Sequence, residues 1–461
     1  MSDMSSSSTS TTSSGSVSID LAAYIAPYHG NTLYARLLFI AKNFPSHAAE
    51  AYRLLSMALK SGNNSRLYCD IFSDKSTSFG SSFEFDKSWV DETERKNHMH
   101  LERLEADFTA AKSSMIKESI RVAYSDLARH HSEVGNLQEA LRAFTRIRDY
   151  TSMPRHTEEM VMHVCTLAID MNRPHLLSNF ITSSVEEGAT SSLVRDKLRA
   201  LAAIQALSQK DFAGASRRFS SVESHISGNF GTVVSGEDVA LGAVVCGIAG
   251  LERGELQSLL LDNQRFKPLL DLVPALRQLM GHFLAGRYAE VKAALGPSGE
   301  VYKRVNMDLH LHTHAEQLFA TIHDKLVLQY FRPYNAIRMS RAADDMFPEA
   351  TTAEEREVQE DELEAHVRKL IEMGSLQARL DAGCTEGSTL RRVWQDDRAL
   401  ALQAVCTAAT DSSVKIKQSI LRLSLLQHSY FLSTRKQQRG GDSSRDKYLE
   451  STSSHMDVDL E

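Results

Sequence analysis

Pairs of short helices separated by tight turns recur through the middle of the chain, and this repetition is the feature that most limits its fold. In the clearest pair, residues 120–150, Ala128 lies on the first helix, Gly135 at the turn and Ala140 on the second helix. Small residues let antiparallel helices approach closely, and glycine readily adopts a positive φ at the turn. The spacing is typical of tetratricopeptide-like repeats, which stack into a scaffold with extended surfaces. Further units are predicted at residues 160–185, 198–222, 240–261 and 274–295, with turns at residues 172–174, 210–211, 254 and 286.

The stretch LVLQYFRPY, residues 326–334, marks the predicted end of this array. Its apolar residues recur at spacings of three and four, which is typical of one face of a helix. Pro333 cannot donate a backbone hydrogen bond and biases the residue before it away from the helical conformation, so the helix should end here. We therefore predict that the array packs against a terminal module through Leu326, Tyr330, Phe331 and Pro333.

The segment after this joint has the element order of a winged helix. A sheet of two or three strands leaves an edge with unpaired N–H and C=O groups, which can pair with another chain. We predict that this edge includes Leu376, Ala378, Arg379 and Leu380. The pattern indicates a helix, a second helix, a strand, a turn and a second strand at residues 336–347, 354–373, 376–381, 382–388 and 389–395.

The last predicted helix, residues 397–434, has an apolar stripe that no later domain covers. A stripe of this length is uncommon on a lone monomer and usually marks a partner surface. We therefore expect this helix to form a bundle with helices of other chains. The stripe consists of Ile416, Ile420, Leu423 and Tyr430.

These patterns divide the chain into successive segments. Residues 63–82 are polar and rich in Ser and Gly, so we expect a loop within the N-terminal part. The two ends of the chain have little to bury and should be disordered. We expect a Ser/Thr tail, N-terminal helices with a long bracing helix, the repeat array, the winged helix, the bundle helix and a second tail at residues 1–16, 17–113, 114–334, 335–396, 397–434 and 435–461.

Charge and cysteine content limit the function classes. The net charge of −7 argues against a protein that binds nucleic acid over its whole surface. The second helix of the predicted winged helix is acidic, where a helix that reads DNA needs Arg and Lys. The five cysteines have no paired spacing, which indicates reduced thiols rather than disulfides or a zinc site. Because the sequence shows no signal-peptide pattern and no long apolar run, we expect a soluble intracellular protein.

Three alternating histidines, His310, His312 and His314, are the main candidates for a metal site, and His323 follows them. On a strand they would share one face and could hold zinc. The surrounding sequence instead indicates a turn that enters a helix, where residues two apart diverge. The serines and cysteines show no nucleophile-elbow pattern, and no glycine-rich phosphate loop is present. We therefore expect no catalytic residue, no metal site and no cofactor.

Several stretches resemble the PCI-domain family in their order along the chain. They are SWV, IKESIR, GNLQEAL, RIRDY, LVLQYFRPY and LIEMGSLQARLD, at residues 88–90, 116–121, 135–141, 146–150, 326–334 and 370–381. The family supplies subunits to the proteasome lid, the COP-nine signalosome and translation initiation factor three, and these stretches resemble its signalosome members most. The resemblance implies a mainly α fold, with a right-handed tetratricopeptide-like superhelix followed by a winged-helix PCI module and a C-terminal helix.

The resemblance also implies a function. Such a signalosome member is a non-catalytic scaffold in the complex that removes the ubiquitin-like protein Nedd8 from cullins, using zinc held by a different subunit. Its partners would be other PCI and MPN subunits, with cullin-RING ligases reached through the complex, in the cytoplasm and nucleus. Neither a membrane nor direct nucleic-acid binding is expected. A scaffold subunit of the proteasome lid and, less favoured, a nucleic-acid-binding winged-helix protein stay open as alternatives.

Overall fold

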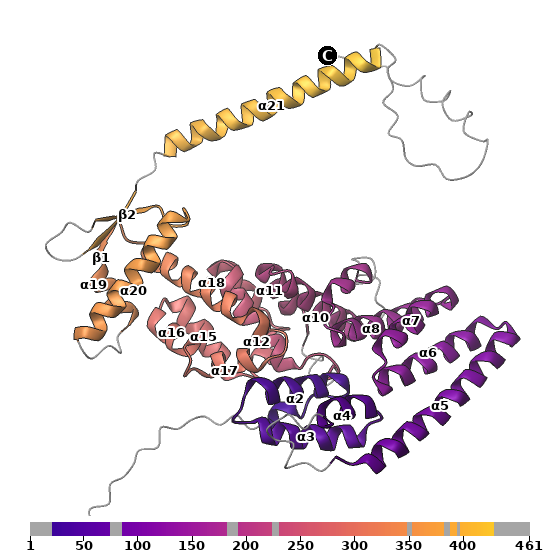
Figure 1. The fold of residues 1–461 in the computed structure, drawn as a ribbon. Helices are drawn as coiled ribbons and strands as arrows, with labels where there is room; N and C mark the ends of the chain where they lie inside the picture. The colour runs from indigo at the N-terminus through magenta and orange to yellow at the C-terminus, as the bar shows by residue number, and fades with distance from the viewer. Residues whose placement is uncertain are drawn as a thin grey trace, which may run out of the picture. The chain divides into compact units, whose positions relative to one another are not determined.

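The computed structural model describes residues 21–73, 85–181, 192–223, 230–347, 353–381, 388–393 and 397–427 (Figure 1). Helices predominate in these residues, and the strands among them form a three-stranded sheet. The mainly helical fold predicted from the sequence is therefore confirmed. The chain divides into two units, Met1–Arg392 and Val393–Glu461. No helix in the described ranges combines the length and the apolar character that a membrane span requires.

The first unit begins with helices that share a small core of their own. Their apolar faces meet in a cluster that includes Leu37, Ile40, Leu55, Leu59 and Tyr68. The spacings of three between Leu37 and Ile40 and of four between Leu55 and Leu59 explain why each helix presents one buried face. The helices are α1 (Leu21–Ile25), α2 (Asn31–Asn43), α3 (Ala48–Ser61) and α4 (Ser65–Phe72).

Helix α4 corrects the prediction of a loop over residues 63–82. Asn64 caps its start by accepting a hydrogen bond from the backbone N–H of Leu67 at 3.0 Å. The Tyr68 ring is buried and packs against the rings of Phe72 and Trp89. Aromatic packing onto the next helix therefore stabilises a segment whose polar composition suggested a loop. Residues 74–84 lie outside the described residues.

A long helix, α5 (Lys87–Ser114), leads from these helices to the array. Asp86 caps it by accepting a hydrogen bond from the Trp89 backbone N–H at 3.1 Å. The array then runs through α6 (Lys117–Val134), α7 (Leu137–Ile147), η1 (Arg148–Tyr150), α8 (Pro154–Asp170), η2 (Pro174–Asn179), α10 (Ser192–Ser208), α11 (Phe212–Ser220), α12 (Gly236–Gly250), α13 (Arg253–Leu256), η4 (Gln257–Leu261), α14 (Lys267–Leu270), α15 (Pro274–Ala285), α16 (Tyr288–Leu295), α17 (Glu300–Met307) and α18 (His312–Phe331).

Most of the predicted turns between paired helices are present. Gly135 (φ 92°) separates α6 from α7, and Gly286 (φ 75°) separates α15 from α16. Lys210 (φ 63°) and Asn172 (φ 54°) reverse the chain after α10 and α8. The turn predicted at Gly254 is wrong, because α12 has already ended and this residue lies inside α13.

Helix α12 is buried on nearly every side and lies in the core of the array. A side chain at Gly250 would place its Cβ 2.6 Å from the backbone nitrogen of Ala213, so only glycine fits at this crossing with α11. The close approach of the two backbones explains why a run of apolar and glycine residues forms an interior helix here.

The Arg36 guanidinium from α2 is buried inside the first unit and joins the N-terminal helices to the array. Its Nη2 lies 2.8 Å from Asp238 Oδ2 in α12, and its Nη1 lies 3.2 Å from Asp308 Oδ2 after α17. The Tyr28 ring centroid lies 4.1 Å from the guanidinium carbon, and the Tyr28 hydroxyl donates to Asp238 at 2.6 Å. Arg36 also donates to the Tyr24 hydroxyl at 2.7 Å. Because each buried charge has an opposite partner, the desolvation penalty is offset.

The winged-helix module follows α18. Its sheet has the order β1-β3-β2 with antiparallel pairing, and its core contains Ile337, Leu363, Val367 and Leu390. The prediction of a helix from residue 336 is wrong for the first turn, because Ala336–Arg338 pairs with β3 and the helix begins at Met339. The elements are β1 (Ala336–Arg338), α19 (Met339–Met346), α20 (Ala353–Glu372), β2 (Ala378–Asp381) and β3 (Thr389–Arg392).

The second unit contains one described helix, α21 (Asp397–Gln427), which is 31 residues long. The sequence predicted helical structure over residues 397–434, and residues 428–434 lie outside the described residues.

Candidate interaction surfaces

The end of α18 joins the core of the array to the core of the winged helix. Leu326 belongs to the array core, whereas Tyr330 and Phe331 belong to the winged-helix core one turn later. Tyr330 also donates its hydroxyl to Asp345 in α19 at 2.7 Å, and burial raises the pKa of this phenol. Pro333 lies outside this packing because it is exposed, although α18 does end just before it. The joint therefore rests on the two aromatic residues rather than on the proline.

Strand β2, predicted as a sheet edge, pairs only with β3 among the described strands. The backbone N–H of Arg392 donates to Asn335, and that of Met339 donates to the carbonyl of Ser388. The backbone N–H and C=O groups of the even-numbered residues of β3 therefore point toward β1. Because these groups alternate along a strand, those of Arg391 point toward β2. Since Arg391 pairs with Arg379, the N–H of Arg379 points inward to β3.

This geometry changes the role predicted for Arg379. The outward-facing backbone groups of β2 belong to Ala378 and Leu380, and the N–H of Ala378 is already donated to the carbonyl of Leu376 at 3.1 Å. Leu380 therefore offers both an outward N–H and an outward C=O. Leu376 precedes the strand and packs on the winged-helix core.

A hollow of about 260 Å³ lies between this strand and the joint. Its apolar walls include Leu328, Phe331, Leu376 and Leu390, and Arg392 is at its border. A small apolar side chain of a partner strand at β2 could enter this hollow, which would add burial to the backbone pairing.

Helix α21 exposes the apolar stripe predicted from the sequence. The exposed fractions of Ile416, Ile420 and Leu423 are 59%, 60% and 64%. Tyr430, the fourth predicted member, lies outside the described residues. Leu402 and Val405 are exposed on the same helix at 59% and 65%, so the apolar surface extends beyond the predicted stripe.

Helix α20 occupies the position of a DNA-reading helix but has an acidic surface. Burial raises the pKa of Glu360, and the neighbouring carboxylates Asp361 and Glu364 raise it further. Such an accumulation of negative charge repels phosphates. The acidic surface of α20 therefore disfavours contact between this helix and nucleic acid.

The alternating histidines lie where a turn enters α18, as predicted: His310 is in the turn, and His312 and His314 are in the first turn of the helix. His310 stands before the helix, and burial lowers the pKa of its imidazole to about 4. The His312 ring packs against Phe39 of α2 at a centroid distance of 4.9 Å. The first two histidines thus contribute to the packing of the first unit.

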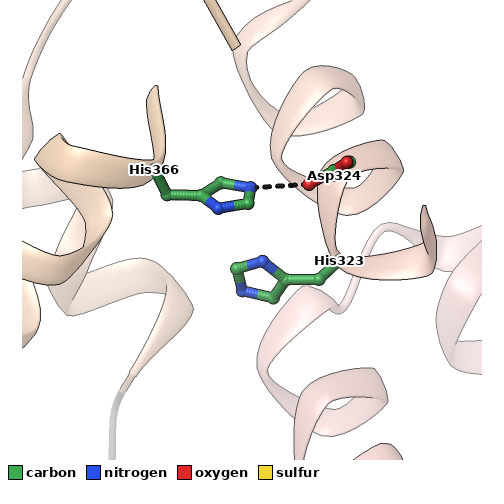
Figure 2. Close-up of side chains that lie close together, drawn as sticks. All are labelled: His323, Asp324 and His366. Carbon is green, nitrogen blue, oxygen red and sulfur yellow. Dashed lines mark ion pairs between the residues drawn. The ribbon is translucent and has the colours of Figure 1, made fainter. Parts of the chain in front are cut away.

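The described histidines and acidic residues include one group close enough to share a metal ion, and it lies elsewhere: His323, Asp324 and His366 (Figure 2). The sequence singled out His323 but offered no reason to connect it to His366, which lies on another helix. Burial, together with the nearby Lys292 ammonium, lowers the pKa of His323 to about 4.

Two of the described thiols are deeply buried. Burial raises the pKa of both Cys165 and Cys246 to about 12, so neither is a reactive thiolate at neutral pH. Cys384 lies outside the described residues.

Comparison with known proteins agrees with a helical array followed by a winged-helix module. A family model described as "26S proteasome subunit RPN7" matches residues 86–259, and the "PCI domain" model matches residues 300–384. COP9 (COP-nine) signalosome complex subunit 1 of Arabidopsis thaliana is 28% identical over 416 residues, which covers 89% of this chain and 91% of the relative.

Two further relatives extend the comparison. COP9 signalosome complex subunit 1b of Drosophila melanogaster is 30% identical over 309 residues, covering 65% of this chain and 56% of the relative. The 26S proteasome non-ATPase regulatory subunit 6 of Caenorhabditis elegans is 22% identical over 298 residues, covering 62% of this chain and 68% of the relative. The chain carries a PCI domain and is similar to subunit 1 of the COP9 signalosome along most of its length.

Proposed function

We propose that the chain is a non-catalytic scaffold subunit of a COP9 signalosome. The observation that carries this proposal is the match to a signalosome subunit 1 over 91% of that relative's length, which includes both the array and the PCI module. Two surfaces fit the role: the outward edge of β2 with its neighbouring hollow, and the exposed apolar stripe of α21.

The proposed partners are the other PCI and MPN subunits of the complex. In this proposal a neighbouring PCI subunit pairs with the winged-helix edge, and several subunits contribute helices to a bundle with α21. The complex removes Nedd8 from cullins of cullin-RING ligases through a catalytic zinc on another subunit. We place the protein in the cytoplasm and nucleus, where such a complex would meet its ligases.

The proteasome lid is the second candidate, because the matched family model over residues 86–259 is named for a subunit of the 26S proteasome. Affinity purification of the full chain from its own cells, followed by mass spectrometry, separates the two. Recovery of signalosome subunits in stoichiometric amounts supports the proposal, whereas recovery of lid subunits in their place would overturn it.

The two contact surfaces can be tested separately in the same assay. Truncation after Asp396 removes α21, so it should abolish incorporation into the full complex yet leave pairwise binding of the winged helix. Leu380→Pro deletes the outward N–H of β2 and should weaken the pairwise contact. Leu380→Ala is the matched control, because it reproduces the loss of side-chain packing but keeps the N–H. If the truncated chain enters the complex at wild-type yield, the bundle role of α21 is wrong.

A further inference from the structure

Three side chains with metal-binding atoms meet where α18 passes α20. His323 and Asp324 come from α18, and His366 comes from α20 (Figure 2). One ligand atom from each lies within 4.8 Å of the others, and His366 Nε2 lies 3.0 Å from Asp324 Oδ1. Adjacent residues on a helix project about 100° apart, but both His323 and Asp324 still bring a ligand atom to within 4.8 Å of that of His366.

This set of atoms fits the coordination of a transition metal. A tetrahedral zinc ion with bonds of about 2.0–2.1 Å requires ligand atoms roughly 3.3 Å apart. The 3.0 Å separation of His366 and Asp324 is close to that value, and the ligand atom of His323 lies within 4.8 Å of both. Imidazole nitrogen favours Zn²⁺ and related ions over the hard cations Mg²⁺ and Ca²⁺.

The contact between His366 and Asp324 also supports a cation. The two atoms lie 3.0 Å apart, the length of a hydrogen-bonded ion pair, and the carboxylate favours a positive charge on or beside the imidazole. A metal ion would take the place of the proton between them. The side chains of His366 and Asp324 are 21% and 36% exposed, so an ion can reach the group from solvent.

Nearby positive charge opposes a cation at this position. Lys292 acts on both imidazoles, and Lys369 acts on His366. The Lys292 ammonium lies 3.2 Å from the ring centroid of Phe347, and burial lowers its pKa to about 8. The opposing charge is therefore removed at mildly alkaline pH, and metal binding should be of moderate rather than high affinity.

We propose that His323, Asp324 and His366 bind one divalent transition-metal ion, with Zn²⁺ as the preferred ion. Three protein ligands leave a fourth position for water. The ion would link the last helix of the array to the second helix of the winged helix, about two turns before Tyr330 and Phe331. Its role would be structural, because a bound ion that links two helices stabilises their packing.

The test uses the purified full chain after treatment with a chelator. Titration calorimetry with ZnCl₂ should give one ion per chain, MgCl₂ should give no binding, and Zn²⁺ should raise the melting temperature. Co²⁺ should produce visible absorption bands of a four-coordinate ion. His366→Gln and Asp324→Asn should each weaken Zn²⁺ binding at least tenfold, whereas Lys292→Met should strengthen it several-fold.

A second histidine pair provides the control. His130 Nδ1 lies 3.1 Å from His100 Nδ1 where α6 packs on α5, so His130→Gln removes an imidazole from a comparable pair. This variant should keep wild-type Zn²⁺ affinity. If His366→Gln binds Zn²⁺ as tightly as the wild type, or if no stoichiometric Zn²⁺ binds at all, the group is an ion pair between His366 and Asp324 and the proposal is wrong. Circular dichroism establishes that each variant is folded.

Discussion

Helices α18 and α21 are both long and both have apolar residues at helical spacing, but only α18 buries them. Ile322, Leu326 and Val327 of α18 are 1%, 3% and 0% exposed, whereas Ile416 and Ile420 of α21 are 59% and 60% exposed. The difference shows that periodicity predicts a face that must be covered but does not say what covers it. In α18 the rest of the chain supplies the cover; in α21 we propose that other chains do.

The largest effect is expected inside the first unit, at Arg36. Arg36→Ala leaves the buried carboxylates of Asp238 and Asp308 without their shared cation and should lower the free energy of unfolding by about 5 kcal/mol. Arg142, which pairs with Glu139 on an exposed surface, is the matched control, and its replacement by Ala should change stability by less than about 1 kcal/mol. Urea unfolding of both variants measures the contrast. Equal small effects would mean that the buried network does not hold α2 in place.

The next largest loss of stability is expected at the joint between α18 and the winged helix. Phe331 is 4% exposed in the winged-helix core, so Phe331→Ala should lower the free energy of unfolding by about 3–5 kcal/mol. Thermal unfolding and assembly are the measurements. An unchanged melting temperature together with normal assembly would show that this ring does not contribute to the core.

A smaller and pH-dependent effect is expected at Asp170, at the end of α8. Burial raises the pKa of this carboxyl to about 6, and Asn31 donates a hydrogen bond to it at 3.2 Å. The folded state therefore binds a proton more tightly than the unfolded state, so stability falls as the pH rises from about 4 to 6.

Asp170→Asn removes this ionisation and keeps an oxygen that can accept from Asn31. Because the residue is half-buried, the variant should be more stable than wild type by only about 1 kcal/mol above pH 6 and equal to it near pH 4. Melting curves at a series of pH values test this, with the exposed Asp107→Asn as control. A gain that does not vary with pH would contradict the role of ionisation.

The smallest effect on stability is expected on α21. Ile420→Ala should change the free energy of unfolding by less than about 0.5 kcal/mol, because the side chain is already exposed. Ile322→Ala on α18 is the matched substitution and should cost about 2–5 kcal/mol. When equal amounts of folded protein are compared, Ile420→Ala should reduce incorporation into the complex more than Ile322→Ala does. A large loss of stability from Ile420→Ala would mean that the stripe is intramolecular core.

Local pattern was enough to predict most of the paired helices, the end of α18 at the joint and the two strands β2 and β3, because each shows a periodicity within a short stretch of sequence. It failed at α4, where the polar stretch is held by Tyr68 packing on the later Trp89. It failed again at β1, because a three-residue strand depends on pairing with β3 about 50 residues later. The side chains of Arg36 and His366 gave no local signal, since their partners lie on distant helices.

The position of β3 at the centre of the sheet has a further consequence for assembly. Outward backbone groups lie on β1 at one edge and on β2 at the other, and these edges differ in sequence and length. A contact between the β2 edge of one module and the β1 edge of the next is head-to-tail, so it does not close as a symmetric pair would. Modules joined in this way form a row with a direction. The side chains along the two edges of each module can then determine which protein binds next to it.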